Sequence, residues 1–64
     1  MNSEVSKLHP GMVVIINRAQ DPFEFHTGKV IECLMTKSGD FIHLVRVLYD
    51  QYAMYEEHEL KDAK

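Results

Sequence analysis

Hydrophobic and polar positions follow one another in short runs along this chain, and turn-forming residues separate the runs. Residues 12–17 are rich in β-branched side chains, which fit a pleated strand better than a helix. Residues 28–35 form a second such run, which opens on a glycine. A third run spans 41–49. Alternation places one set of its side chains on a single face, namely Phe41, His43, Val45, Val47 and Tyr49.

The residues between these runs are typical of turns. Residues 9–11, His-Pro-Gly, favour a bend before the first run, because proline fixes its own backbone and restricts the residue before it. Residues 37–40 predict a hairpin turn in which Gly39 takes a positive φ. Glu32 stands in the middle of the second run, which indicates either one solvated face or a β-bulge there.

The last dozen residues allow two interpretations. Residues 52–55 form a short apolar run, 56–58 suit one helical turn, and 59–61 suit a closing strand. The competing interpretation is a helix over 52–63, because Ala, Met, Glu and Leu all favour helix. We prefer strand, turn and strand, because the apolar residues are dense early and then stop abruptly.

Five short strands on one small chain predict an all-β domain, a five-stranded barrel with a long first loop at 18–27. We expect a flexible segment over 1–9, the barrel over 10–61 and a tail over 62–64. In the first strand the barrel interior takes Met12, Val14 and Ile16. Val13 and Ile15 then need a second cover, which either the terminal segment or a partner supplies.

Composition narrows the classes of function. The chain has 64 residues, 45% hydrophobic composition and a net charge of −3, with its seven lysines and arginines scattered. A folded domain is therefore expected, whereas the basic footprint of most nucleic-acid binders is missing from the linear sequence. Neither a long apolar run nor a signal-peptide pattern is present, and Cys33 is the only cysteine. These features predict a cytoplasmic protein, or one peripheral on the cytoplasmic face of a membrane complex.

Candidate chemistry is sparse. The four histidines lie far apart, and none shares a metal-ligand spacing with Cys33. His26 or His43 would make a nucleophile pair with Cys33, but no third group to orient it is evident. Carboxylates gather at Asp50 and at 56–59, where a solvated, partner-facing edge is expected. We therefore predict no enzyme activity, no cofactor and no metal.

Aromatic residues point instead to binding. Phe23 and Phe25 lie on the long loop, and Tyr52 and Tyr55 lie near the end of the chain. In a barrel of this topology the first loop and the turn before the last strand come close, so these rings can form a groove for a protein. The alternative is that some rings plug the barrel ends, which is favoured for Tyr55. The predicted partner-binding residues are Phe23, Phe25, Tyr52, Tyr55, Arg18, Val13 and Ile15.

Several segments carry a resemblance to SH3-like barrels over residues 9–61. They are the opening Pro10-Gly11-Met12-Val13-Val14, the loop motif at 21–23, Gly28-Lys29-Val30-Ile31, the run 45–49 and the segment 55–60. The layout is similar to small barrel subunits of cyanobacterial and chloroplast electron-transfer complexes. Examples are the S subunit of the photosynthetic NADH-dehydrogenase-like complex and the small barrel subunit of photosystem I. The resemblance implies an accessory or regulatory subunit that binds a larger protein complex.

Residues 28–31 also resemble the opening of a KOW-type motif, which occurs in barrels of ribosomal proteins and transcription elongation factors. That resemblance implies a nucleic-acid- or ribosome-associated alternative. It requires four cations to converge on one face, namely Arg18, Lys29, Lys37 and Arg46. A homodimer through the first strand is as consistent with the sequence as a heteromeric complex.

Overall fold

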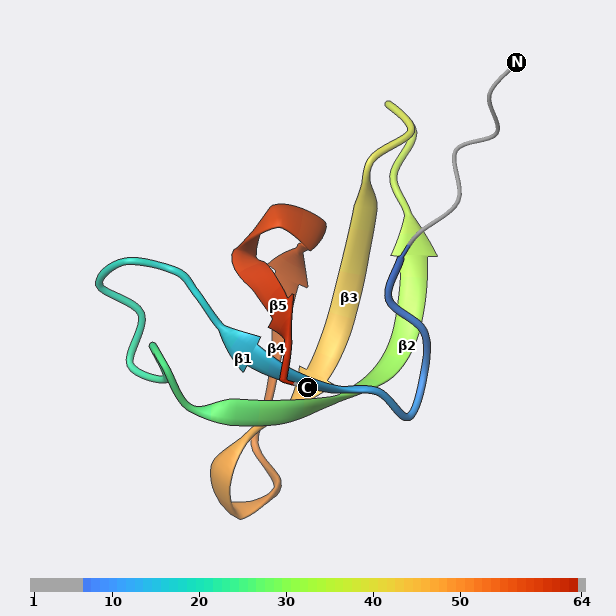
Figure 1. The fold of residues 1–64 in the computed structure, drawn as a ribbon. Coiled ribbons are helices and arrows are strands. Elements are labelled where there is room, and N and C mark those ends of the chain that lie inside the picture. The colour runs from blue at the N-terminus through green and yellow to red at the C-terminus, as the bar shows by residue number, and fades with distance from the viewer. Residues whose placement is uncertain (1–6, 64) are drawn as a thin grey trace.

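The computed structural model describes residues 7–63, which form one five-stranded antiparallel sheet (Figure 1). The strand order is β4-β3-β2-β1-β5. In chain order the elements are β1 (Val13–Ile16), β2 (Thr27–Met35), β3 (Phe41–Arg46), the 3₁₀ helix η1 (Leu48–Asp50), β4 (Tyr52–Glu56), the 3₁₀ helix η2 (Glu57–Glu59) and β5 (Leu60–Asp62). The prediction of five short strands is therefore confirmed.

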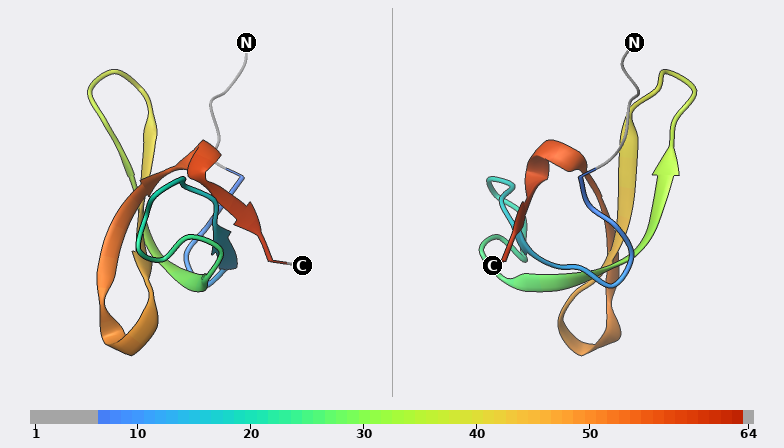
Figure 2. Two further views of the ribbon diagram at one scale, coloured as in Figure 1. Left: turned by 90° about the vertical axis from the view of Figure 1, so that its left-hand side faces the viewer. Right: turned by 45° about the vertical axis from the view of Figure 1, so that its right-hand side comes forward.

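The long strand β2 bends and serves two neighbours. Its first residues pair with β1, with Val13 opposite Lys29, and its remainder pairs with β3. The register shifts between Val30 and Glu32, so one extra residue enters β2 there. Of the two alternatives offered for Glu32, the structure shows both: a bulge lies beside it, and its side chain is exposed. A bulge increases the local bend and twist of a strand. Figure 1 shows β2 turning sharply at this point, and Figure 2 shows the β2–β3 hairpin extending beyond the other strands.

The two ends of the sheet are β4 and β5, and the single turn of η2 connects them. Among the strand pairings of residues 7–63, none joins β4 to β5, so the sheet is open in its hydrogen bonding. The structure thus confirms the all-β class and the antiparallel sheet, but not a closed barrel. Residues 52–62 form strand, turn and strand as preferred, and the competing helix over 52–63 is wrong.

The inner face of the coiled sheet carries the core. The buried apolar side chains are Leu8, Val14, Ile16, Val30, Val45, Val47, Tyr55 and Leu60. Val14 and Ile16 are fully buried as predicted, while Met12 is partly buried and packs against this cluster. Leu8 is also a core residue, although the segment 1–9 was expected to be flexible; residues 1–6 lie outside the described part of the chain. At the other end, Asp62 was expected to begin the tail, but it is the last residue of β5.

The third strand ends earlier than its sequence pattern predicts. β3 stops at Arg46, and the chain then turns through η1, where Tyr49 has a φ of 56°. Tyr49 is 90% exposed, so its predicted place on the inner face beside Val45 and Val47 is wrong. The hairpin turn at 37–40 is confirmed, with Gly39 at a φ of 90°. Within residues 7–63, no helix has the length and apolar character needed to cross a membrane.

Gly28 lets β2 approach β3 closely. A Cβ atom placed on Gly28 would lie 2.6 Å from Cγ1 of Val45 and 3.0 Å from the carbonyl oxygen of Arg46. Val45 is fully buried, so its side chain cannot withdraw into open space. The glycine is therefore required by packing rather than by a turn.

We expect Gly28→Ala to lower the free energy of unfolding by about 1–3 kcal/mol, because overpacking a tight contact displaces its neighbours. Urea unfolding followed by circular dichroism measures the change. The matched control is Thr27→Ala, which changes the preceding, exposed residue of β2 and should cost less than about 1 kcal/mol. Equal unfolding midpoints for the two variants would show that the contact with Val45 relaxes without cost.

Candidate functional site

The long loop at 17–26 is fastened to the far end of the chain. One carboxylate oxygen of Asp21 accepts hydrogen bonds from the Phe23 backbone N–H, at 2.8 Å, and from the Tyr55 hydroxyl, at 3.0 Å. Arg18 lies 3.4 Å from the Glu59 carboxylate, and its guanidinium stands 6.0 Å from the centre of the Tyr55 ring. The predicted meeting of this loop with the turn before the last strand is therefore confirmed.

The four aromatic residues predicted to bind a partner do not form one groove. Tyr55 is only 1% exposed and belongs to the core, as the plug interpretation favoured, and Phe23 packs against that core. Phe25 and Tyr52 remain exposed, at 71% and 56%, but on different elements. Of the four predicted rings, only these two are placed to touch a partner.

Phe25 is held in an unusual backbone conformation. Its φ is 69°, in the left-handed region that bulky side chains seldom adopt, and its backbone N–H donates to the Ile16 carbonyl at 2.7 Å. Such strain persists only where surrounding contacts fix it, and it often accompanies binding sites. The loop backbone is therefore held at Phe25, whose apolar ring is exposed to solvent.

A row of exposed side chains crosses the outer face of the sheet. Val13 pairs with Lys29, Lys29 with Arg46, and Arg46 with Tyr52. Directly opposed residues in a sheet project from the same face. Two predicted binding residues, Val13 and Tyr52, thus stand at the ends of one row with two cations between them. Ile15 is half-buried in β1, where β2 and β5 flank it.

The next two rows of the outer face are mostly apolar. Glu32 pairs with Leu44 and Leu44 with Met54, and the following row joins Leu34, Ile42 and Glu56. We define the outer patch as the apolar members of these rows together with Tyr52: Leu34, Ile42, Leu44, Met54 and Tyr52. Leu34 and Met54 are 40% and 49% exposed, and Ile42 and Leu44 are half-buried. Sequence reasoning missed this patch, although the apolar residues on both faces of the run 41–49 signalled it.

The cations required by a nucleic-acid-binding surface do not converge. Lys29 and Arg46 are cross-strand neighbours, but Arg18 faces Glu59 in the long loop and Lys37 lies in the β2–β3 turn. Arg46 also has Asp50 within 3.8 Å. Only two of the four cations therefore share a surface.

Beneath the sheet, a thiol, an imidazole and a carboxylate form a line. The sulfur of Cys33 lies 3.0 Å from Nδ1 of His43, and Nε2 of His43 lies 3.2 Å from a carboxylate oxygen of Glu57. The His43 side chain is fully buried. The expectation that no third group orients this histidine is wrong, because Glu57 does so. Within residues 7–63, no cluster of three ligand side chains is arranged to hold a metal ion.

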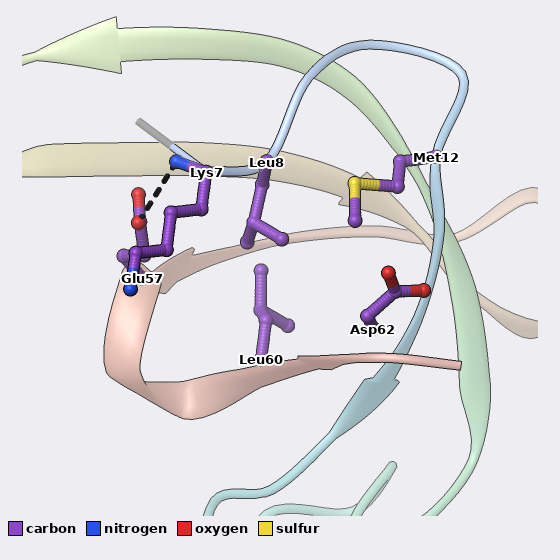
Figure 3. A pocket seen from close by; sticks show the side chains of 6 residues that line it. All are labelled: Lys7, Leu8, Met12, Glu57, Leu60 and Asp62. Carbon is purple, nitrogen blue, oxygen red and sulfur yellow. Dashed lines mark hydrogen bonds between the residues drawn. The ribbon is translucent and has the colours of Figure 1, made fainter. Parts of the chain in front are cut away.

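A groove of about 420 Å³ lies beside this line, between the N-terminal segment and the last elements (Figure 3). Its lining residues are Lys7, Leu8, Met12, Glu57, Leu60 and Asp62. The Lys7 backbone N–H donates to the Glu57 carboxylate at 3.1 Å, which ties the N-terminal segment to η2. The groove is apolar at Leu8, Met12 and Leu60, with a carboxylate at Glu57 and another at Asp62.

Tyr55 is a titratable group whose environment shifts its pKa markedly. Burial, followed by the hydrogen bond to Asp21 and the negative charge of that residue, raises the pKa of Tyr55 from 10.0 to about 12. The folded state therefore favours the neutral phenol. The stabilisation is complete below the unfolded pKa and is lost as the pH rises through the folded pKa.

We expect the free energy of unfolding to fall by about 2 kcal/mol as the pH rises from 10 to about 12, because Tyr55 is forced to ionise. Chemical unfolding across this range measures the slope. Tyr55→Phe should remove most of it, whereas Tyr52→Phe, at an exposed ring on the same strand, should leave it intact. The same slope in all three proteins would show that other groups cause it.

No family model, curated protein or solved structure matches this chain. The resemblances of residues 10–14 and 28–31 to known barrels therefore remain predictions.

Proposed function

We propose that this protein is a non-catalytic interaction module, an accessory or regulatory subunit that binds a larger protein through the outer patch. The observation that carries the proposal is the exposure of apolar side chains on the outer face of β2, β3 and β4. Leu34, Met54 and Tyr52 are each at least 40% exposed, and Ile42 and Leu44 lie between them.

Physical reasons support a protein partner. Single exposed apolar residues are common on any protein surface, whereas a contiguous apolar surface is typical of an interaction site. The inner face of the sheet is already filled by the core. Covering the outer patch therefore requires another surface, which adds apolar burial that a chain of 64 residues lacks.

The position of the patch suits a partner that contacts both a face and an edge. β4 lies at one end of the strand order and pairs with β3 alone among the described strands. An edge strand can receive a strand from another chain through backbone hydrogen bonds, while neighbouring side chains give specificity. Tyr52 and Met54 lie on this strand, so face and edge contacts are continuous. Phe25 supplies a second contact on the separate loop.

An SH3-like identity is part of the same proposal. The strand order β4-β3-β2-β1-β5 and the single 3₁₀ turn between β4 and β5 support it. On this basis the partner belongs to a multi-subunit complex, as in the electron-transfer complexes that the sequence resembles.

We expect Leu34→Ser combined with Met54→Ser to weaken partner binding at least tenfold, because both side chains are exposed and each loses apolar contact. The tagged wild-type chain identifies the partner by co-purification from its native host. Titration of purified partner against each variant then measures affinity. Circular dichroism should show an unchanged fold.

Two exposed aromatic residues provide controls. Tyr49→Ser removes a 90% exposed ring from η1, outside the outer patch, and should leave affinity unchanged. Phe25→Ser tests the loop alone and should weaken binding less than the double variant. Loss of binding with Phe25→Ser but not with the double variant would show that the loop binds the partner. It would refute the proposal that the outer patch does. The predicted pair Phe23 and Phe25 is unsuitable as a double variant, because Phe23 packs against the core.

A further inference from the structure

The line of Cys33, His43 and Glu57 has the composition of an activated nucleophile. Cys33 lies on β2 directly opposite His43 on β3, and Glu57 begins η2. The two contacts, at 3.0 Å and 3.2 Å, join thiol, imidazole and carboxylate in that order. A nucleophile within reach of a base that a third group orients is the arrangement by which proteins activate weak nucleophiles.

Hydrogen-bond chemistry assigns a donor and an acceptor to each contact of the line. An ionised carboxylate only accepts hydrogen bonds, so Nε2 of His43 carries the proton and donates to Glu57. Nδ1 of the neutral ring is then an acceptor, and the Cys33 thiol donates to it. Transfer of the thiol proton to Nδ1 creates a thiolate beside an imidazolium, which the Glu57 carboxylate stabilises.

The residues around this line hold Glu57 in place and leave Cys33 partly exposed. Glu57 is held from its other side by the Lys7 backbone N–H, at 3.1 Å (Figure 3). The Leu8 carbonyl oxygen, 3.8 Å from the sulfur, is a second acceptor for the thiol proton beside Nδ1 of His43, and Cys33 retains partial exposure. The remaining titratable group facing His43 from a neighbouring strand is Tyr55, its cross-strand partner on β4, whose hydroxyl is occupied by Asp21.

We propose that Cys33 is a modification site for small hydroperoxides, with His43 as its base and Glu57 as the positioning residue. The thiol proton passes to Nδ1, and the sulfur attacks one peroxide oxygen. The S–O bond forms as the O–O bond breaks. The leaving oxygen takes the proton from the imidazolium and departs as water, or as an alcohol from an alkyl hydroperoxide. Sulfur is oxidised to sulfenic acid and the peroxide is reduced, so no further reactant is required.

The experiment treats the full chain with hydrogen peroxide and follows Cys33 sulfenic acid by dimedone trapping and mass spectrometry. An ordinary cysteine is only a few per cent thiolate near neutral pH, so the folded protein should react about tenfold faster than the same chain in urea. Iodoacetamide alkylation under the same conditions should show the same ratio. A folded protein that reacts more slowly than the unfolded chain would overturn the proposal, because the thiol would then be merely shielded.

Variants separate activation from packing. Glu57→Gln keeps an oxygen that can accept from His43 but removes the charge, and should slow oxidation several-fold with an unchanged circular dichroism spectrum. The ultraviolet absorbance of the thiolate should fall in parallel. Glu56→Gln is the matched control, because Glu56 lies 3.5 Å from His58 and its charge does not meet His43. Equal rates and equal thiolate absorbance in wild type, Glu57→Gln and Glu56→Gln would refute the assignment.

Discussion

The bend of β2 at Val30–Glu32 sets the relation between all the other strands. Before the bend β2 pairs with β1, and after it with β3, so one strand belongs to both halves of the sheet. The inner face can then close over Val14, Val30 and Val45 without a second layer. A flat sheet of this length would leave one apolar face uncovered. The bulge and the close contact at Gly28 are both consequences of this need.

The same bend separates the two faces by function. Residues before the bulge turn toward the core at Gly28 and Val30, and alternation after it sends Cys33 inward and Leu34 outward. The second half of β2 and β3 therefore supply Leu34, Ile42 and Leu44 to the outer patch, and Cys33 and His43 to the line beneath the sheet, whereas β4 and η2 supply the rest. Leu34 and Cys33 are thus neighbours in sequence on opposite faces of the β2–β3 hairpin, so one stretch of backbone positions parts of both sites.

Local signals predicted most of the fold. Gly39 marked the hairpin turn, and Glu32 marked the bulge, because each conflicts with regular strand structure at its own position. The end of β3 was not predicted, because the alternating pattern of this run does not indicate that Tyr49 takes a positive φ. Leu8 was missed for a related reason: one leucine in a polar segment has no period to indicate its burial. The orienting role of Glu57 depends on a contact 14 residues from His43, which only the fold creates.

Charge on the outer face gives the proposed interface a direction. The row at Tyr52 carries the cations Lys29 and Arg46, whereas Glu32 and Glu56 lie in the two rows beyond it. A partner with a carboxylate must therefore approach the Tyr52 end, since at the other end it would meet like charge. The net charge of −3 repels extended polyanions only within about 10 Å, because salt screens charges that are farther apart. Recognition of a protein surface, in which apolar contact dominates and a few charges set orientation, agrees with this distribution better than recognition of a nucleic-acid backbone.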